Sequence, residues 1–382
     1  MIKVVFVGIS GFDYPHTRVR CYNFAEQLSK YPDVETRVIS FKDHLGPQFS
    51  EVEMWGLRER DRIKLNMKGL ISLLRYPRSV FYIQKIHYHA AAPLLLSKYW
   101  FNRYIFDYDD YDVDLTVPFK TSFLNRSVFG SDNSQTMTQH IAKGALGCVA
   151  SSKALEDYLR QFNSNVAYIS TGVDIGKFQF VDRRHRKTTT FLWNGLVWGE
   201  EIFKSVVMLL NSFKTVAEKG LDVRLKLVGG GQYMSNVVEH INNEFGDLAS
   251  QIDLDGWVSP EKMPSVLAES DVGLLPLAGD SLWLKSKSPT KLFEYMATGL
   301  PVVASDVGEV HNVIEHQKSG CLATGAQEFT EYMYKMAEDK ALRLSIGQQA
   351  RDRVERQYSL PVLVERLYYY IKKVIKDAYR SH

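Results

Sequence analysis

The stretch Lys287–Ser305 reads K-S-P-T-K-L-F-E-Y-M-A-T-G-L-P-V-V-A-S. Ser288 is a good N-cap and Pro289 suits the first position of a helix. One face of that helix is apolar at helical spacing and the other is polar. The apolar face consists of Leu292, Phe293, Met296 and Ala297, and the polar face of Lys291, Glu294 and Thr298. Gly299 ends the helix, and residues 300–304 follow as a short buried strand, so the stretch predicts a helix–strand unit.

Units of this kind repeat along the chain. Short apolar runs separated by helical stretches occur at 4–7, 38–41, 80–84, 104–106, 146–150 and 166–169, and again at 189–193, 224–228, 272–276 and 302–304. Strands that alternate with helices predict parallel sheets, and a charged break at 182–187 separates the two series. We therefore predict an α/β protein with two Rossmann-like domains that face each other across a cleft. The expected domains are 1–180 and 181–356, and residues 357–382 are expected to form a helix that returns to the N-terminal domain.

Composition narrows the class of protein. The chain has 382 residues, 45% of them hydrophobic and 24% charged, and a net charge of +3, which is too small to argue for a nucleic-acid partner. Its three cysteines (Cys21, Cys148 and Cys321) are widely spaced and fit a reducing compartment. The N-terminal apolar run is too short for a signal peptide, and no segment approaches the length of a membrane span. These features favour a cytoplasmic enzyme.

The charges of the opening stretch suggest a ligand. Lys287 and Lys291 flank the predicted helix N-terminus, and Glu294 lies one turn inside the helix. Backbone N–H groups and two cations attract phosphate, and a carboxylate accepts hydrogen bonds from sugar hydroxyls. This combination suits a nucleoside diphosphate. The alternative is an ordinary surface pair of Lys291 and Glu294 at i,i+3.

The same stretch resembles the donor-site signature of GT-B glycosyltransferases, specifically the retaining family-4 enzymes, whose pattern ends in E-(A/Y)-M-A-x-G-x-P-V-V-A-S. The resemblance continues in Asp255–Val258 with Asp271–Pro276, in Ser170–Asp174, and in Leu227–Gly231 at a strand end. It covers nearly the whole C-terminal half of the chain with specific motifs, and the N-terminal half more loosely.

The resemblance implies a retaining, metal-independent hexosyltransferase without a cofactor, acting in the synthesis of cell-surface polysaccharide or glycoconjugates. The donor would be a nucleotide-diphosphate sugar and the acceptor a saccharide or lipid-linked saccharide. Lys287 and Lys291 would stabilise the leaving diphosphate, Glu294 would bind the ribose, and Trp257 and Val258 would lie beside the base. The donor site would also include Gly195, Ser288, Pro289 and Thr290.

In the N-terminal half, the loop Gly8-Ile-Ser-Gly11 lacks the G-x-G-x-x-G of a dinucleotide site. In the resembled family a glycine loop here lies near the acceptor and the donor phosphate. Arg18 and Arg20 follow closely and could reach an anionic acceptor such as a lipid diphosphate. Their alternative interpretation is a solvated face of a helix predicted over 17–29.

An acidic cluster, Asp107–Asp114, follows an apolar strand. Carboxylates gathered at a strand end repel one another, and such an arrangement is typical of sites that bind hydroxyls, a cation or a base. A subset of the resembled family has D-(F/I)-D-D here, which implies that Asp109 or Asp110 orients the acceptor hydroxyl or the sugar. Aspartates that cap a turn, or a metal-binding D-x-D, are the alternatives. His87 and His89 are interpreted as loop histidines without a metal.

Three positions depart from the family pattern. Ser286 replaces the first glutamate of E-x7-E, the arginine expected after Gly195 is absent because Leu196 stands there, and its lysine partner is displaced to Lys204. Two alternatives therefore stay open. The chain could be a non-catalytic GT-B protein that binds a nucleotide sugar or supports a partner transferase, or a sugar-nucleotide epimerase.

Three stretches, 62–78, 94–103 and 368–380, mix basic residues with apolar and aromatic ones. Such stretches can lie on an anionic bilayer, which would bring the protein to the inner face of the membrane. They can equally be amphipathic helices that pack on the core, and both interpretations stay open.

Overall fold

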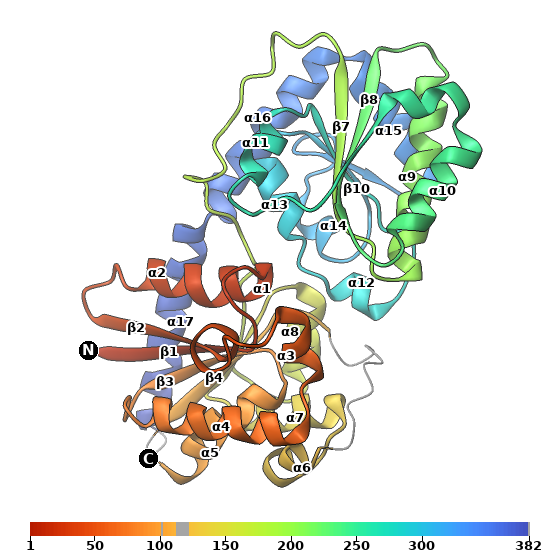
Figure 1. Cartoon of the computed structure of the whole chain (residues 1–382). Coiled ribbons are helices and arrows are strands. Elements are labelled where there is room, and N and C mark those ends of the chain that lie inside the picture. The colour runs from red at the N-terminus through yellow and green to blue at the C-terminus, as the bar shows by residue number, and fades with distance from the viewer. Residues whose placement is uncertain (101, 112–121, 381–382) are drawn as a thin grey trace. The chain divides into compact units, whose positions relative to one another are not determined.

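The computed structural model describes residues 1–100, 102–111 and 122–380. The chain divides into two compact units (Figure 1). The first contains residues 1–171, 286–288 and 360–382, and the second contains 172–285 and 289–359. The division falls at Thr171, before the predicted boundary at 180, and the C-terminal helix is part of the first unit.

The first unit is built on a six-stranded parallel sheet of order β2-β1-β3-β4-β5-β6. Its strands are β1 (Ile2–Gly8), β2 (Val34–Ser40), β3 (Val80–Gln84), β4 (Arg103–Tyr108), β5 (Gly147–Ala150) and β6 (Val166–Tyr168). Its α-helices are α1 (Pro15–Thr17), α2 (Phe24–Leu28), α3 (Glu51–Gly56), α4 (Glu59–Leu73), α5 (Ala91–Tyr99), α6 (Phe123–Phe129), α7 (Ser134–Gly144), α8 (Lys153–Arg160) and α17 (Leu360–Arg380). Shorter helical turns are η1 (Arg18–Asn23), η2 (Phe41–Leu45) and η3 (Tyr88–Ala90).

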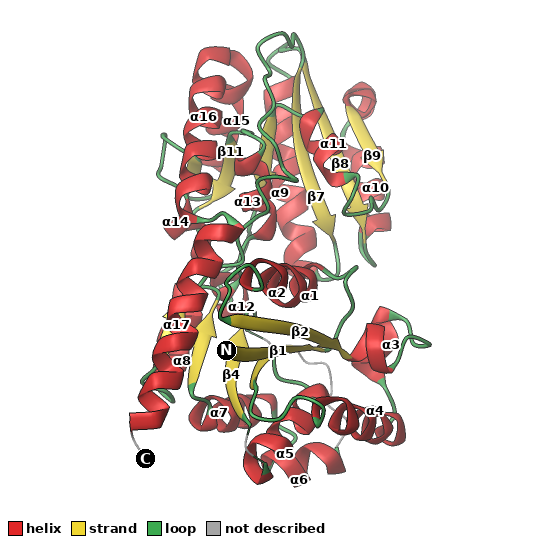
Figure 2. Cartoon of the chain, turned by 90° about the vertical axis from the view of Figure 1, so that its left-hand side faces the viewer, coloured by secondary structure: helices red, strands yellow, loops and turns green. Residues whose placement is uncertain are grey.

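Alternating residues of β1 pack into two separate hydrophobic cores, as expected of a strand with both faces covered. Val5 and Val7 pack with Leu65 of α4 on one face of the sheet. Val4 and Phe6 pack with α2 and α17 on the other face. Figure 2 shows the strands between α2 on one side and α4 and α5 on the other. The helix predicted over 17–29 is interrupted by the π-helical turn η1, in which residues 18–21 are buried.

The second unit has a six-stranded parallel sheet of order β12-β11-β10-β7-β8-β9. Its strands are β7 (Thr189–Leu196), β8 (Val223–Gly230), β9 (Ile252–Asp255), β10 (Val272–Leu275), β11 (Val302–Ser305) and β12 (Cys321–Ala323). Its helices are α9 (Glu200–Ala217), α10 (Met234–Glu244), η4 (Gly246–Gln251), α11 (Met263–Ala268), α13 (Thr290–Ala297), α14 (Glu309–Val313), α15 (Ala326–Glu338) and α16 (Lys340–Gln357), and α12 (Leu282–Ser286) ends at the division between the units.

The predicted α/β class with two parallel sheets is confirmed. In parallel α/β sheets, ligands bind beyond the carboxyl ends of the strands, so the loops that follow the strands are where a site is expected. Within the described ranges, no helix combines the length and apolar character that crossing a bilayer requires.

Candidate functional site

Glycines allow a close backbone approach at the carboxyl ends of β7 and β8. Gly229, at φ 141°, lies so near Gly195 that a Cβ atom there would overlap the Gly195 carbonyl oxygen. Gly231, at φ 116°, packs against the backbone of Val197 in the same way. Positive φ values and this lack of space both require glycine. The strand end predicted from Leu227–Gly231 therefore lies where the carboxyl ends of β7 and β8 pack tightly against each other. We call this side of the second sheet its carboxyl edge.

Helix α13 is fixed against this edge by Tyr295. The Tyr295 side chain is fully buried, its hydroxyl donates to Asn194 Oδ1 at the end of β7, and it accepts from the Asn194 backbone N–H at 3.2 Å. Its ring fills the space beside Gly273 of β10. Burial raises the pKa of Tyr295, so the phenol stays protonated and keeps its donor role. This anchoring sets the position of Lys291, one turn earlier.

The ammonium group of Lys291 lies at the carboxyl end of β7. Its Nζ atom occupies the space that a side chain at Gly195 would take, and it lies 4.8 Å from the ring centroid of the buried Trp193. An ammonium group over an indole face is held by a cation–π attraction. The structure therefore brings together two residues of the predicted donor site, Gly195 and Lys291.

The predicted start of this helix is wrong in two details. α13 begins at Thr290 with Pro289 as N-cap, so Pro289 is not the first helical residue and Ser288 is not the cap. The Ser288 hydroxyl instead accepts hydrogen bonds from the Thr171 hydroxyl at 2.7 Å and from the Thr171 backbone N–H at 3.3 Å. The side chain of the N-cap residue Pro289 has no acceptor, so no side-chain cap bonds the amino end of α13. Backbone donors at an uncapped helix start can serve an anion.

Other predicted donor residues differ in exposure. Lys287 belongs to the short segment 286–288 of the first unit, whereas Lys291 and Glu294 belong to the second. Glu294 is partly buried and Trp257 is 67% exposed, so both can meet a ligand, while Val258 packs against the core of the second unit. Thr298 was expected on the polar face but is buried, because its hydroxyl donates to the Tyr295 carbonyl and its own carbonyl accepts from Arg183.

The first unit buries one of the predicted acceptor-side cations completely. Arg20 has no exposed surface; its Nε donates to Asp107 Oδ2 at 2.9 Å and its Nη2 pairs with Asp107 Oδ1. Its Nη1 donates to the Ile169 carbonyl at 2.7 Å and to the Ser170 carbonyl at 3.0 Å. Both interpretations of Arg20, as an acceptor ligand and as part of a solvated helix face, are therefore wrong. The guanidinium joins η1 to β4 and to the end of the first sheet.

Carboxylates already occupy the amides of the glycine loop. The Gly11 N–H donates to Glu51 Oε1 at 2.7 Å and the Phe12 N–H to Asp43 Oδ2 at 2.9 Å. Burial raises the pKa of Glu51. Arg18 is 9% exposed and donates to the Asp13 carbonyl at 3.1 Å, so it holds the same loop and is not a solvated residue. An anionic group could reach these amides only by displacing Glu51 or Asp43.

The acidic cluster encloses a lysine that the sequence reasoning missed. Lys85 follows β3 with φ 62°, is 5% exposed, and its Nζ lies 3.6 Å from Asp110 Oδ2 and 4.0 Å from Asp109 Oδ1. Gln84 Nε2 donates to Asp109 Oδ2 at 3.0 Å. Asp112 and Asp114 lie outside the described residues. Asp109 and the partly buried Asp110 therefore form a charged group with Lys85, and the segment from residue 112 onward that they could cap lies outside the described residues.

Three buried polar atoms of this group have no hydrogen-bond partner among the described residues. They are Asp109 Oδ1, Asp110 Oδ1 and His16 Nε2. Burial lowers the pKa of His16 well below its ordinary value, and the charge of Lys85 lowers it further. Buried polar atoms are nearly always satisfied in native proteins, so several together indicate a place for a polar ligand. We refer to Lys85, Asp109, Asp110 and His16 as the acidic-edge group.

His87 and His89 are buried. His87 lies in the connection between β3 and η3, as the sequence suggested, whereas His89 is part of η3. His89 Nε2 lies 2.9 Å from the Gln84 carbonyl oxygen, and burial lowers the pKa of His89 to about 4. Burial also lowers the pKa of His87 well below its ordinary value. In the described parts of the chain, no three His, Cys, Asp or Glu side chains are grouped so that they could hold a metal ion.

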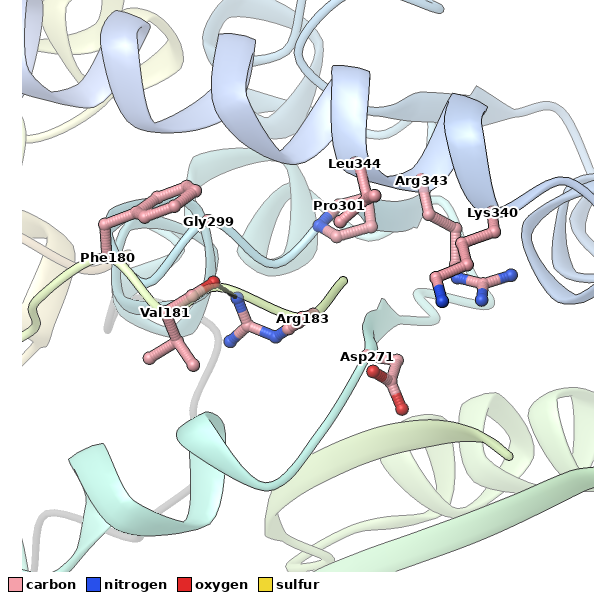
Figure 3. A pocket seen from close by; sticks show the side chains of 9 residues that line it. All are labelled: Phe180, Val181, Arg183, Asp271, Gly299, Pro301, Lys340, Arg343 and Leu344. Carbon is pink, nitrogen blue, oxygen red and sulfur yellow. Dashed lines mark hydrogen bonds between the residues drawn. The ribbon is translucent and has the colours of Figure 1, made fainter. Parts of the chain in front are cut away.

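A small basic pocket of the second unit is structural (Figure 3). Arg183 donates to the Thr298 carbonyl at 2.7 Å and to the Ser270 carbonyl at 2.6 Å, and Arg343 donates to the Ala337 carbonyl at 3.0 Å. These carbonyls follow or end α13, α11 and α15, so the guanidinium groups cap helix C-termini. Asp271, which also lines the pocket, precedes β10, so this is the amino end of the sheet and not its carboxyl edge.

Comparison with known proteins gives one family match, which lies within the second unit apart from residues 286–288. Residues 190–339 match the family model described as Glycosyl transferases group 1. The chain is 27% identical over 204 residues to a phosphatidyl-myo-inositol mannosyltransferase of Mycolicibacterium smegmatis. This alignment covers 52% of this chain and 50% of that protein. It is 24% identical over 184 residues to the GDP-Man:Man(3)GlcNAc(2)-PP-Dol alpha-1,2-mannosyltransferase of Dictyostelium discoideum, with 47% and 35% covered. These matches span half or less of each relative's length.

Among solved structures, HepE from Anabaena in complex with UDP-glucose aligns with a TM-score of 0.70 and 15% identity. The alignment covers 98% of this chain and all of that chain. The chain therefore has the GT-B fold, and the resemblance predicted from the motifs, to the group 1 type of GT-B glycosyltransferase, is confirmed. The predicted placement of the two domains about a cleft stays a prediction.

Proposed function

We propose that this protein is a glycosyltransferase that moves a hexosyl group from a nucleotide-diphosphate sugar to an acceptor hydroxyl with retention of configuration. The observation that carries the proposal is Lys291, whose ammonium group is held between Gly195 and Trp193 beside the uncapped start of α13. Positive charge and backbone donors at the carboxyl end of a parallel sheet suit a diphosphate.

The donor would lie along α13 of the second unit. Lys291 and the amides at the start of α13 would stabilise the departing diphosphate, on which negative charge grows in the transition state. Glu294, one turn further along, would accept hydrogen bonds from the ribose, and the exposed Trp257 offers a flat face for the base. Lys287 would add a second cation. The mechanism needs no metal and no covalent protein nucleophile.

The acceptor hydroxyl or the transferring sugar would meet the acidic-edge group. Asp109 Oδ1 and Asp110 Oδ1 can accept hydroxyl hydrogen bonds that the described residues leave unmade. Lys85 lies within ion-pair distance of both carboxylates and compensates their charge, so we assign it a positioning role. The relatives include a mannosyltransferase named for phosphatidyl-myo-inositol. Saccharide or lipid-linked saccharide acceptors, in cell-surface polysaccharide or glycoconjugate synthesis at the cytoplasmic side of the membrane, would fit this site.

The deciding experiment measures nucleotide release from UDP-, GDP- and ADP-sugars with and without saccharide acceptors. Turnover that requires an acceptor supports a transferase. Binding without turnover would indicate the non-catalytic GT-B protein that Ser286 and Leu196 leave open, and conversion of the donor alone would indicate an epimerase. The anomeric configuration of the product, followed by NMR, tests retention.

Asp109→Asn and Asp110→Asn test the assignment of the acidic-edge group. At least one should abolish transfer while nucleotide affinity stays unchanged, because the nucleotide is assigned to the second unit. EDTA should have little effect. Strong inhibition by EDTA that Mn²⁺ reverses would revive the D-x-D interpretation, and full activity in both variants would remove the group from the mechanism.

A further inference from the structure

One side of the first unit exposes apolar side chains that the proposed reaction does not use. α4 contacts both α5 and α6, and the three helices lie side by side (Figures 1 and 2). On these helices and directly after α4 and α5, large apolar side chains face solvent. They are Met67 (59% exposed), Ile71 (61%), Leu74 (43%), Tyr99 (70%), Trp100 (53%) and Phe123 (69%).

Basic side chains flank these apolar ones. Along α4 the exposed residues Arg60, Lys64, Met67 and Ile71 recur at helical spacing, and none of the exposed side chains of this fully described helix is acidic. The exposed basic residues on these helices and directly after them are Arg60, Lys64, Lys68, Arg75, Arg78, Lys98, Arg103 and Arg126. Together with the six apolar residues they form what we call the basic–apolar surface.

Hydrogen bonds fix the two ends of this surface. Asn102 Nδ2 donates to the Tyr76 and Ser79 carbonyls at 3.0 and 3.1 Å, which holds the segment after α5 beside the end of α4. Glu59 at the start of α4 accepts from the Leu124 N–H at 2.7 Å and from the Ser122 hydroxyl at 3.1 Å, which holds the start of α6. Trp100 and Phe123 therefore lie toward opposite ends of α4, whose 15 residues span about 22 Å.

We propose that the basic–apolar surface binds an anionic phospholipid bilayer. Aliphatic, Trp and Tyr side chains enter the headgroup boundary, and Lys and Arg attract acidic lipids, so each contributes part of the binding energy. Protein interfaces instead gather their anchors at a central cluster and are depleted in lysine. Here the apolar groups are spread along α4 and lysine is interspersed with them. The surface lies outside the residues proposed for sugar transfer, so the two proposals stand or fall separately.

The test uses the full-length protein in co-sedimentation with vesicles of phosphatidylcholine, with or without phosphatidylglycerol. Binding should require phosphatidylglycerol and weaken with salt. Lys64→Glu with Arg75→Glu should lower the partition coefficient by at least roughly fivefold for each basic residue removed, the factor that about 1 kcal/mol per residue corresponds to. Brominated lipids should quench tryptophan fluorescence in the wild type and much less in Trp100→Phe.

Lys373→Glu with Lys376→Glu is the matched control. Both residues are exposed on α17, which packs against the opposite face of the same sheet, and the change in net charge is identical. This variant should bind vesicles like the wild type. Equal loss of binding in both double variants, or equal binding to the two kinds of vesicle, would overturn the proposal. So would a failure to bind either vesicle, and self-association abolished by Ile71→Glu would then identify the surface as a protein interface.

Discussion

Charged residues at the carboxyl ends of the strands are buried in the first sheet and partly exposed in the second. In the first unit Arg20, Lys85 and Asp109 are buried and are bonded or paired within the protein. In the second unit Lys291 and Glu294 are partly exposed beside a glycine-lined strand end, and Trp257 is mostly exposed. Buried charges must be balanced inside the protein, whereas a charged ligand can also reach the partly exposed ones. The difference suits one edge to positioning a neutral hydroxyl and the other to binding a diphosphate.

The largest expected effect is on stability, and it should distinguish the buried Arg20–Asp107 pair from the exposed Arg224–Asp253 pair. Arg20→Ala should lower the free energy of unfolding by about 3–5 kcal/mol, because Asp107 would be left buried without its partner. Arg224, whose side chain and that of its partner Asp253 are each 43% exposed, provides the control. Arg224→Ala should cost less than about 1 kcal/mol in the same urea titration. Equal costs would contradict the contrast between the two units.

Lys291 tests the second edge. Lys291→Ala should lower turnover by about 10²–10³-fold, as expected for the loss of one group that stabilises transition-state charge, and should weaken donor binding much less. Lys287→Ala should act in the same direction. A small loss of stability with normal kinetics would make Lys291 a structural residue.

The position of Lys291 can be tested without removing its charge. Gly195→Ala would put a methyl group where the ammonium lies, whereas Gly230→Ala, at the end of β8, would meet nothing within 4 Å. Turnover should fall in the first variant and stay near the wild-type value in the second. A reversed order would mean that the ammonium does not work from this place.

Acid should destabilise the first unit through its buried histidines. Burial lowers the pKa of His89 to about 4 from an ordinary value near 6.5, so the unfolded chain binds the proton more tightly between these pH values. Stability is therefore complete above about pH 6.5 and is lost as the pH falls toward 4, by about 3 kcal/mol in total. His89→Gln should flatten this part of the curve in denaturant titrations from pH 7 to 4. An unchanged slope would assign the effect to other groups, such as His87.

Glu294 should give the smallest change. Glu294→Gln keeps the shape of the side chain but removes the charge that accepts ribose hydroxyl hydrogen bonds. Donor binding should weaken by about 1.5–3 kcal/mol in calorimetry. Unchanged affinity in a folded variant would remove Glu294 from the ribose site.

Local patterns in the sequence determined much of this protein. The apolar runs identified parallel strands, Leu227–Gly231 was correctly placed at a strand end, and the apolar face of α13 was found correctly. The motifs also identified the family that residues 190–339 match. Each of these features depends on residues a few positions apart, so it can be seen in one stretch of chain.

Tertiary structure decided the rest, because partners distant in sequence are not visible locally. In the sequence Arg20 resembles a solvated helix residue, but the order of the strands places Asp107, 87 positions away, beside it. Ser288 resembled a helix cap, but Thr171 takes its hydroxyl. The only sequence signal for Lys85 was its place at the end of a predicted strand, and its ion pairs depend on two aspartates that follow the neighbouring strand β4. Local sequence determines where strands end, but only the sheet order determines which charges meet there, and burial determines whether a ligand can also reach them.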